Sequence, residues 1–377
     1  MKIKDKRITY FFQGGRKNKL LSKEVYAAEM FYGYEYFKKN NTLNLVEFKD
    51  PTSKLGILFF KLIEVRLRRL LSLPLYWSFV LKKEDYSHIK NSDFVIYGNN
   101  RVACSMLPFE IFCKLIKSDY KSLSFIMGLF AREPRFYIFK KVQLIYIKNY
   151  LKFIDYHVFL SKKELYKAQK KFPQYKNKFY FIPFGVDTEV WNNPNLETKL
   201  KNEILFVGND GFRDYELVEK LINSLPQYKF NIVSENINIE KLKKDNFTIY
   251  SGNWAKQAIT DTQLRDLYKS CVLTVLPIKE TLQPSGQSVA LQSIACGTPV
   301  LISKYEGFWD YENFKDNENI FFIEKNNLNL WINNIKKIIN MDKEQYNKVS
   351  IQVSELIKSS YNLIKFSIKI EEILLEK

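Results

Sequence analysis

Residues 272–300 read VLTVLPIKETLQPSGQSVALQSIACGTPV and contain one complete strand–helix–strand unit. The apolar run Val272–Leu276 predicts a buried strand, and Val300–Ile302 predicts the next one. Between them, Pro284–Ser285 is a helix start signal and Gly297–Pro299 is a stop signal, so we expect a helix of about eleven residues. A helix between two buried strands is typical of a parallel sheet with crossover helices.

Short apolar runs alternate with helical patterns along the whole chain of 377 residues. This alternation predicts an α/β protein with doubly wound, Rossmann-like parallel sheets. Strands are predicted at residues 8–12, 43–48, 94–97, 123–127, 157–160, 179–182, 204–207, 230–233, 247–250, 272–276, 300–302 and 320–323. The length and the number of strands predict two such domains in series.

The polar, lysine-rich stretch Lys162–Lys178 is the best candidate for the end of the first sheet. We therefore expect a first domain over residues 1–178 and a second domain over residues 179–357. The last predicted helix, Ser354–Lys377, is long enough for its residues from about 358 to 377 to pack back on the first domain.

The chain carries 59 Lys and Arg against 41 Asp and Glu, a net charge of +18. Such a surplus suits an anionic partner, either nucleic acid or an acidic membrane surface. The positive charge is scattered and no recognition motif accompanies it, so nucleic acid is not the favoured partner. Hydrophobic residues make up 46% of the chain, which excludes global disorder.

Four cysteines and two histidines show no C-x-x-C or H-E-x-x-H spacing, so we expect no metal site. So few cysteines in so long a chain do not form a disulfide framework, which indicates a reducing, cytoplasmic compartment. No apolar run reaches the ~20 residues of a membrane-spanning helix.

The N-terminus of the helix predicted after Ser285 would lie at the carboxyl edge of the sheet, where parallel folds bind ligands. Unpaired N–H groups and the positive end of the helix dipole favour a phosphate there, and Gly286 permits close approach. Gln292 would lie roughly 10 Å further along, which suits a ribose whose diphosphate touches the helix tip. From the spacing alone, an ordinary buried helix with a serine cap explains the pattern equally well.

Residues 204–214, ILFVGNDGFRD, form a second candidate site. A predicted strand ends at Gly208, and the polar loop after it is of the nest-like kind that binds anions through backbone amides. The loop lacks the full G-x-G-x-x-G pattern, which argues against NAD. Arg213 suits two phosphate oxygens. The alternative, a solvent-exposed arginine at a helix start, would oppose the helix dipole unless an anion lay nearby.

Basic and apolar residues mix over Leu55–Leu71. As a helix, this segment has a broad apolar face and a cationic face of Lys61, Arg66, Arg68 and Arg69. The pattern fits an interfacial helix on anionic lipid. A core helix with a solvated basic edge explains it equally well.

Together these segments resemble a GT-B glycosyltransferase of the large retaining group often called family 4 or group 1. The run IPFGVDTEVW at 182–191 matches the start of that family's second domain, and 207–214 resembles its first glycine loop, whose cation contacts the donor diphosphate. Residues 284–300 resemble its donor-binding helix with the A-C-G-x-P-V ending. The pair Gly14–Gly15 is similar to its N-terminal glycine loop, although a plain turn explains these glycines equally well.

The chain departs from the family at two glutamates eight residues apart, one near the transferred sugar and one on the ribose. Pro284 and Gln292 stand at those positions. Gln292 can still hydrogen-bond a ribose hydroxyl. Pro284 cannot replace the first carboxylate, for which Ser285, Gln287 and Glu280 are candidates.

The resemblance implies two domains facing a cleft and transfer of a sugar from a nucleotide-diphosphate sugar to a hydroxyl of a cell-surface glycan or lipid-linked acceptor. It also implies retention of configuration, with the nucleotide sugar as co-substrate and no metal or other cofactor. The expected catalytic residues are Arg213, Gly14, Gly15 and Glu280. The expected donor-binding residues are Gly208, Asn209, Asp210, Arg213, Pro284, Ser285, Gly286, Gln287 and Gln292.

Two alternatives stay open. One is a catalytically degenerate GT-B binding or scaffold protein, as the missing glutamates suggest. The other is a different GT-B enzyme, such as a nucleotide-sugar epimerase. The expected location is the cytoplasm, with peripheral attachment to the inner face of the cytoplasmic membrane.

Overall fold

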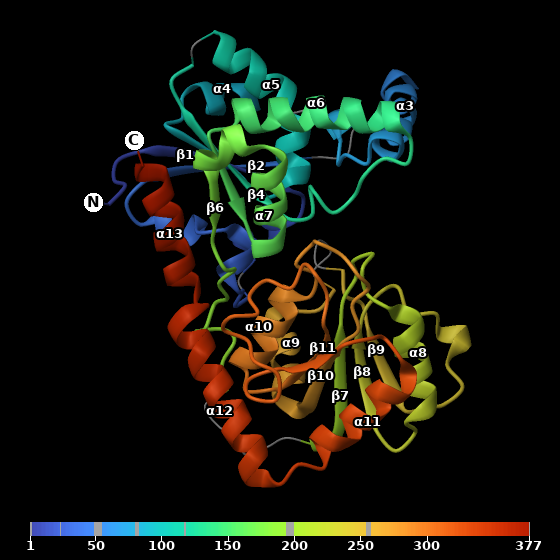
Figure 1. Cartoon of the computed structure of the whole chain (residues 1–377). Coiled ribbons are helices and arrows are strands. Elements are labelled where there is room, and N and C mark those ends of the chain that lie inside the picture. Colours follow the sequence, from blue (N-terminus) through green and yellow to red (C-terminus); the bar gives the residue numbers. More distant parts are fainter. Residues whose placement is uncertain are drawn as a thin grey trace. The chain divides into compact units, whose positions relative to one another are not determined.

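The structure is a computed structural model of the chain. It describes residues 2–22, 24–48, 55–79, 83–116, 118–193, 200–253 and 258–376. The chain divides into two compact units (Figure 1). The first unit contains residues 1–21, 31–182 and 367–377, and the second contains residues 22–30 and 183–366.

The first unit is built on a six-stranded parallel sheet with the order β2-β1-β3-β4-β5-β6. Its strands are β1 Arg7–Gln13, β2 Thr42–Phe48, β3 Phe94–Tyr97, β4 Lys121–Ile126, β5 Tyr156–Phe159 and β6 Phe179–Phe181. The helices that connect them are α1 Arg16–Leu21, α2 Tyr34–Lys38, α3 Leu55–Leu71, α4 Lys83–Lys90, α5 Asn100–Leu115, α6 Tyr137–Phe153 and α7 Lys162–Lys171. Short 3₁₀ turns lie at Trp77–Phe79 and Pro173–Lys178, and a third, Ala28–Phe31, connects the second-unit segment 22–30 to the first unit.

The second unit repeats this plan, with the strand order β12-β11-β10-β7-β8-β9. Its strands are β7 Leu200–Val207, β8 Lys229–Val233, β9 Phe247–Tyr250, β10 Cys271–Leu276, β11 Val300–Ser303 and β12 Phe321–Ile323. Its helices are α8 Tyr215–Ser224, α9 Asp261–Ser270, α10 Gln287–Ala295, α11 Leu328–Ile339, α12 Lys343–Ser360 and the start of α13 Leu363–Leu375, with a 3₁₀ turn at Ile239–Lys241.

All of the strands expected from the sequence are present, and both sheets are parallel. β10 is buried along its whole length, because helices cover both faces of such a sheet. In the second unit, the strand order reverses between β7 and β10, which pair directly. Ligands bind at such a reversal in open α/β sheets, beyond the carboxyl ends of the strands. The loops after Val207 and Leu276 therefore lie where a site is expected.

The single C-terminal helix expected over Ser354–Lys377 is wrong, because α12 ends at Ser360 and α13 begins at Leu363. Between them the backbone pairs with Val186. The N–H of Val186 donates to the Tyr361 carbonyl at 2.8 Å, and the N–H of Leu363 donates to the Val186 carbonyl at 2.9 Å. These bonds replace helical ones. Only the residues from Ser367 onward belong to the first unit, instead of those from about 358.

Residues 22–30 belong to the second unit, whereas the sequence suggested a continuous first domain over 1–178. The backbone N–H of Ala27 donates to Asp261 Oδ2 at 2.6 Å, and that of Ala28 donates to Asp187 Oδ2 at 3.2 Å. Carboxylates distant in the sequence thus hold this short segment.

None of the helices in the described ranges combines the length and apolar character needed to cross a bilayer.

Candidate functional site

The loops after β7 and β10 are joined through their backbones. Arg213 and Ile278 form an antiparallel bridge. On either side of it, the N–H of Asp214 donates to the Pro277 carbonyl at 2.9 Å, and that of Lys279 donates to the Phe212 carbonyl at 2.8 Å. These bonds bring the two segments singled out in the sequence together.

Arg213 lies at the centre of this junction and is only 3% exposed. Its Nη1 donates to Asp210 Oδ2 at 2.8 Å and to Ser285 Oγ at 2.7 Å, and its Nε donates to the Val207 carbonyl at 3.4 Å. The alternative of a solvent-exposed arginine at a helix start is therefore wrong. The guanidinium is instead fixed between the two loops.

Ser285 completes a triangle with these two residues, because its Oγ donates to Asp210 Oδ2 at 2.7 Å. The α10 N-cap is Gly286, in the left-handed conformation at φ 84°, and no side chain caps the helix there. The serine cap that the alternative explanation of this helix required is thus absent from α10. The Ser285 hydroxyl points to Arg213 and Asp210, while its carbonyl accepts from the hydroxyl of Tyr305.

Gly208 is required by the position of the arginine. A Cβ at this residue would lie 2.5 Å from Arg213 Nε and 2.9 Å from its Cγ. The Gly208 N–H donates to the Val233 carbonyl at 3.1 Å, so this amide, expected to meet a phosphate, is used inside the sheet. The contribution of Gly208 is the room that it leaves for the guanidinium.

Asn209 and Asp210 point in different directions. Asn209 Oδ1 accepts from the backbone N–H of Glu235 at 2.7 Å, which holds the loop to the segment after β8. Asp210 Oδ1 accepts from the N–H of Phe212 at 2.8 Å, while its Oδ2 faces Arg213 and Ser285. Asp210 therefore orients the arginine, and Asn209 orients the loop.

Gln292 lies further along α10, is buried, and is held at both ends of its amide. Its Oε1 accepts from the hydroxyl of Tyr268 at 3.2 Å, and its Nε2 donates to Glu29 Oε1 at 2.8 Å. Glu29 Oε1 also accepts from Trp191 Nε1 at 2.7 Å. Burial raises the pKa of the Glu29 carboxyl to about 7, although the hydrogen bonds from Gln292 and Trp191 favour its charged form.

Glu29 is the residue that the sequence reasoning missed. It follows no motif, and 263 positions separate it from Gln292. The only hint in the sequence is the neutral residue at 292, which can share a site with a carboxylate from elsewhere.

The remaining expected residues make none of the hydrogen bonds described above between Arg213, Asp210 and Ser285. Pro284 and Gln287 are buried at the start of α10. Glu280 is exposed, and its Oε1 accepts from the backbone N–H of Glu306 at 2.8 Å, so its carboxylate braces a neighbouring loop.

Gly14 and Gly15 belong to the first unit, where they connect β1 to α1. Gly15 has φ 101°, a conformation that favours glycine. Beside this turn, Glu47 Oε1 accepts from the backbone N–H groups of Arg16 and Lys17. A carboxylate of the protein thus lies at the start of α1.

Among the described residues, no group of three or more His, Cys, Asp or Glu side chains is placed to hold a metal ion.

Part of the chain is similar to a known family, and its fold is similar to solved structures. Residues 187–353 match the glycosyl transferases group 1 model. Anabaena HepE, solved with UDP-glucose, is 13% identical with a TM-score of 0.65, over 98% of this chain and 99% of that one. The sucrose-phosphate synthase of Thermosynechococcus elongatus is 13% identical with a TM-score of 0.67, over 98% of each chain.

A glycosyltransferase from Rickettsia africae is likewise 13% identical, with a TM-score of 0.63 over 100% of both chains. No curated protein matches the sequence significantly. The chain therefore has the two-domain GT-B fold, and its residues 187–353 are similar to the group 1 glycosyl transferases.

Proposed function

We propose that this protein is a glycosyltransferase that moves a sugar from a nucleotide-diphosphate sugar to a hydroxyl group of an acceptor. The family match supports the enzyme class, and HepE, of the same fold, was solved with UDP-glucose. The observation in this chain that carries the proposal is the 2.7 Å contact between Arg213 and Ser285, which brings a buried cation to the N-terminus of α10.

The departing diphosphate needs positive charge, because breaking the bond between sugar and phosphate leaves electrons on the phosphate oxygen. Among the contacts of the described residues, Nε and Nη1 of Arg213 carry hydrogen bonds, which leaves Nη2 for a ligand oxygen. A buried guanidinium and an aligned helix N-terminus need little reorganisation during the reaction. Asp210 offsets the charge of Arg213 and keeps it oriented.

Gln292 is proposed to meet the ribose. One N–H of its amide is donated to Glu29, and its oxygen accepts from Tyr268, so the direction of the second N–H is fixed. A fixed donor of this kind can hydrogen-bond a ribose hydroxyl without losing side-chain entropy on binding.

Retention of configuration, with the leaving phosphate assisting the incoming hydroxyl, is part of the proposal, and so is a reaction without a metal ion or other cofactor. The resemblance supports the first, and the position of Arg213 supports the second. The proposed acceptor is a cell-surface glycan or a lipid-linked glycan, as in polysaccharide biosynthesis. The proposed location is the cytoplasm, at the inner face of its membrane.

A thermal-shift screen against UDP-, GDP- and ADP-sugars tests the proposal. A ligand at 100 times its Kd stabilises the folded state by about 2.7 kcal/mol. For a unit of this size, we expect a rise in Tm of roughly 5–10 °C with one nucleotide class. Arg213→Ala should abolish the shift, whereas the control Lys220→Ala should keep it, because Lys220 is exposed on α8 and pairs with Glu216.

A scaffold protein would give no shift with any nucleotide sugar, and that result would overturn the proposal. An epimerase would bind a nucleotide sugar but release an altered sugar nucleotide without an acceptor. Product analysis by NMR separates this enzyme from a transferase, and it also reports the configuration of the new bond.

A further inference from the structure

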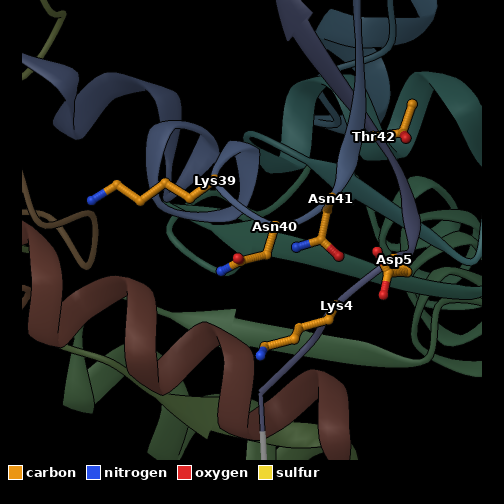
Figure 2. A pocket seen from close by; sticks show the side chains of 6 residues that line it. All are labelled: Lys4, Asp5, Lys39, Asn40, Asn41 and Thr42. Atoms are coloured by element: carbon orange, nitrogen blue, oxygen red, sulfur yellow. The ribbon is translucent and has the colours of Figure 1, made fainter.

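An open hollow of about 360 Å³ in the first unit is lined by Lys4, Asp5, Lys39, Asn40, Asn41 and Thr42 (Figure 2). Its Asn41 is already engaged, since Oδ1 accepts from the Lys6 N–H and Nδ2 donates to the carbonyls of Ile3 and Phe37. The Asn41 side chain therefore serves to hold the chain before β1 beside the start of β2, and the hollow carries no proposal.

Helix α6 carries apolar side chains on two opposite faces, one buried and one exposed to solvent. Its inner face buries Gln143, Ile147, Tyr150 and Leu151. Facing solvent are Ile138 at 66% exposure, Val142 at 43% and Ile145 at 62%, with Phe136 at 58% and Tyr137 at 72% at the helix start. We call Phe136, Tyr137, Ile138, Val142 and Ile145 the α6 outer face.

The spacing of the outer face shows that it is one surface. Ile138, Val142 and Ile145 lie at i, i+4 and i+7, which places them on one side of a helix. Single exposed apolar residues are ordinary in folded proteins, but a contiguous row with two aromatic neighbours marks an interaction surface.

Basic side chains frame this row. Between residues 132 and 153 the chain has six basic residues and one acidic residue, Glu133. The Glu133 carboxylate pairs with Lys171 at 3.3 Å and with Lys140 at 3.6 Å, so its charge is offset. The exposed cations are Arg132, Arg135, Lys141, Lys148 and Lys152.

Charge and aromatic surface are in direct contact at the start of α6. Lys141 Nζ lies 4.8 Å from the centre of the Tyr137 ring, and Arg135 Cζ lies 5.9 Å from that of Phe136. Long cationic side chains beside partly exposed rings can reach anionic headgroups while the rings enter the boundary of the acyl chains.

Helix α3 packs against α6 and extends the same character (Figure 1). Its described side chains begin at Lys61, and those of Leu55–Phe60 lie outside the described residues. Leu62 and Leu70 are 60% and 41% exposed, and Arg66 and Arg69 face solvent. Glu64 and Arg68 are turned inward, to Ser78 and over the Tyr76 ring.

We propose that the α6 outer face, flanked by α3, docks on an anionic lipid bilayer. Charge complementarity favours an anionic lipid surface, because cations flank the apolar row and the nearby carboxylate of Glu133 is paired with two lysines. Basic amphipathic helices with aromatic residues at one end bind such interfaces. The surface belongs to the first unit, whereas Arg213 and Ser285 belong to the second, so the test of lipid binding does not depend on the proposed transfer activity.

Co-sedimentation with vesicles tests this proposal. The full-length chain should bind vesicles of phosphatidylcholine with about 30% phosphatidylglycerol, and binding should weaken at high salt and with phosphatidylcholine alone. Ile138→Asn/Ile145→Asn and Lys141→Glu/Lys148→Glu should each lower the partition coefficient by about tenfold or more. The matched control is Leu330→Asn/Ile351→Asn, since both residues are 44% exposed in the second unit.

The proposal is overturned if the outer-face variants and the control bind equally well, or if the wild type does not bind at low salt. Self-association in light scattering that Ile138→Asn/Ile145→Asn abolishes, without vesicle binding, would assign the surface to a second copy instead. Circular dichroism confirms that each variant is folded. An unchanged nucleotide-sugar thermal shift separates this result from a failure of the proposed function.

Discussion

Glu29 Oε1 accepts a hydrogen bond from Gln292 Nε2 at 2.8 Å, although 263 positions separate the two residues. The same oxygen accepts from Trp191 Nε1 at 2.7 Å. The other carboxylate oxygen accepts from the backbone N–H of Asp187 at 3.3 Å. One buried carboxyl thus ties the segment 22–30 both to the start of the main part of the second unit and to α10.

Removing this carboxyl should destabilise the protein. Glu29→Ala leaves the N–H groups of Trp191 and Gln292 buried without their acceptor, so we expect a loss of about 2–5 kcal/mol in the free energy of unfolding. Urea unfolding followed by tryptophan fluorescence measures it. Glu24→Ala, exposed on the same segment, is the control and should change little. Equal losses in both variants would argue against the assigned contacts.

The pH dependence of stability should report the same group. Burial raises the pKa of Glu29 from its ordinary 4.5 to about 7, so the folded chain binds more protons than the unfolded chain between these values. The associated stability is complete below pH 4.5 and is lost as pH rises through 7. Glu29→Gln should therefore lose less stability than the wild type between pH 5 and pH 8 in urea titrations.

In Glu29→Gln, the free energy of unfolding should still decrease as pH rises. Burial also raises the pKa of Glu110 and of Glu164 to about 7, with the same sign of pH dependence. Parallel curves for the wild type and Glu29→Gln would show that Glu29 does not titrate in this range.

Arg213→Ala should lower the rate of sugar transfer by roughly 10²–10³, comparable to deleting a main electrostatic donor. The reason is the loss of the buried cation that faces Ser285 and the start of α10. The value of kcat/KM for the donor measures it, with Lys220→Ala as the matched loss of a cation on the same unit. A transfer rate in Arg213→Ala equal to that of the control would contradict the role of the arginine.

Substitution by alanine should lower activity at one glycine of the loop after β7 and leave activity unchanged at another. In Gly208→Ala the new Cβ would lie 2.5 Å from Arg213 Nε, so the guanidinium must move and we expect a loss of activity similar to that of Arg213→Ala. In Gly211→Ala the new Cβ meets no described atom within 4 Å, so activity should hold. Donor kinetics of the pair give the result, and equal activities would show that the arginine position is not required.

The sequence contained much of this fold because its signals are local. The strand Cys271–Leu276 is an apolar run that is buried along its whole length, so its pattern is visible without the structure. Pro284 and Gly297 bracket α10 by backbone chemistry alone. The arginine was recognised because a cation at a helix start needs an anion nearby, and Asp210 provides one.

The features that escaped prediction depend on distant partners. Apolar residues continue the helical pattern past Ser360, and only the pairing of Tyr361 and Leu363 with Val186 interrupts it. Glu29 lies in a segment without hydrophobic periodicity, and its role depends on the hydrogen bonds that it accepts from Trp191 and Gln292. Spacing within one stretch of chain carries no information about such pairings.

The division of the chain bears on how its halves can be separated. The backbone passes from one unit to the other at 21/22, 30/31, 182/183 and 366/367. A single protease cut after residue 182 would therefore yield two fragments that each carry a piece of the other's globule. An isolated second unit would need 22–30 to be grafted onto it, and the two fragments should recombine when mixed, because each is incomplete alone.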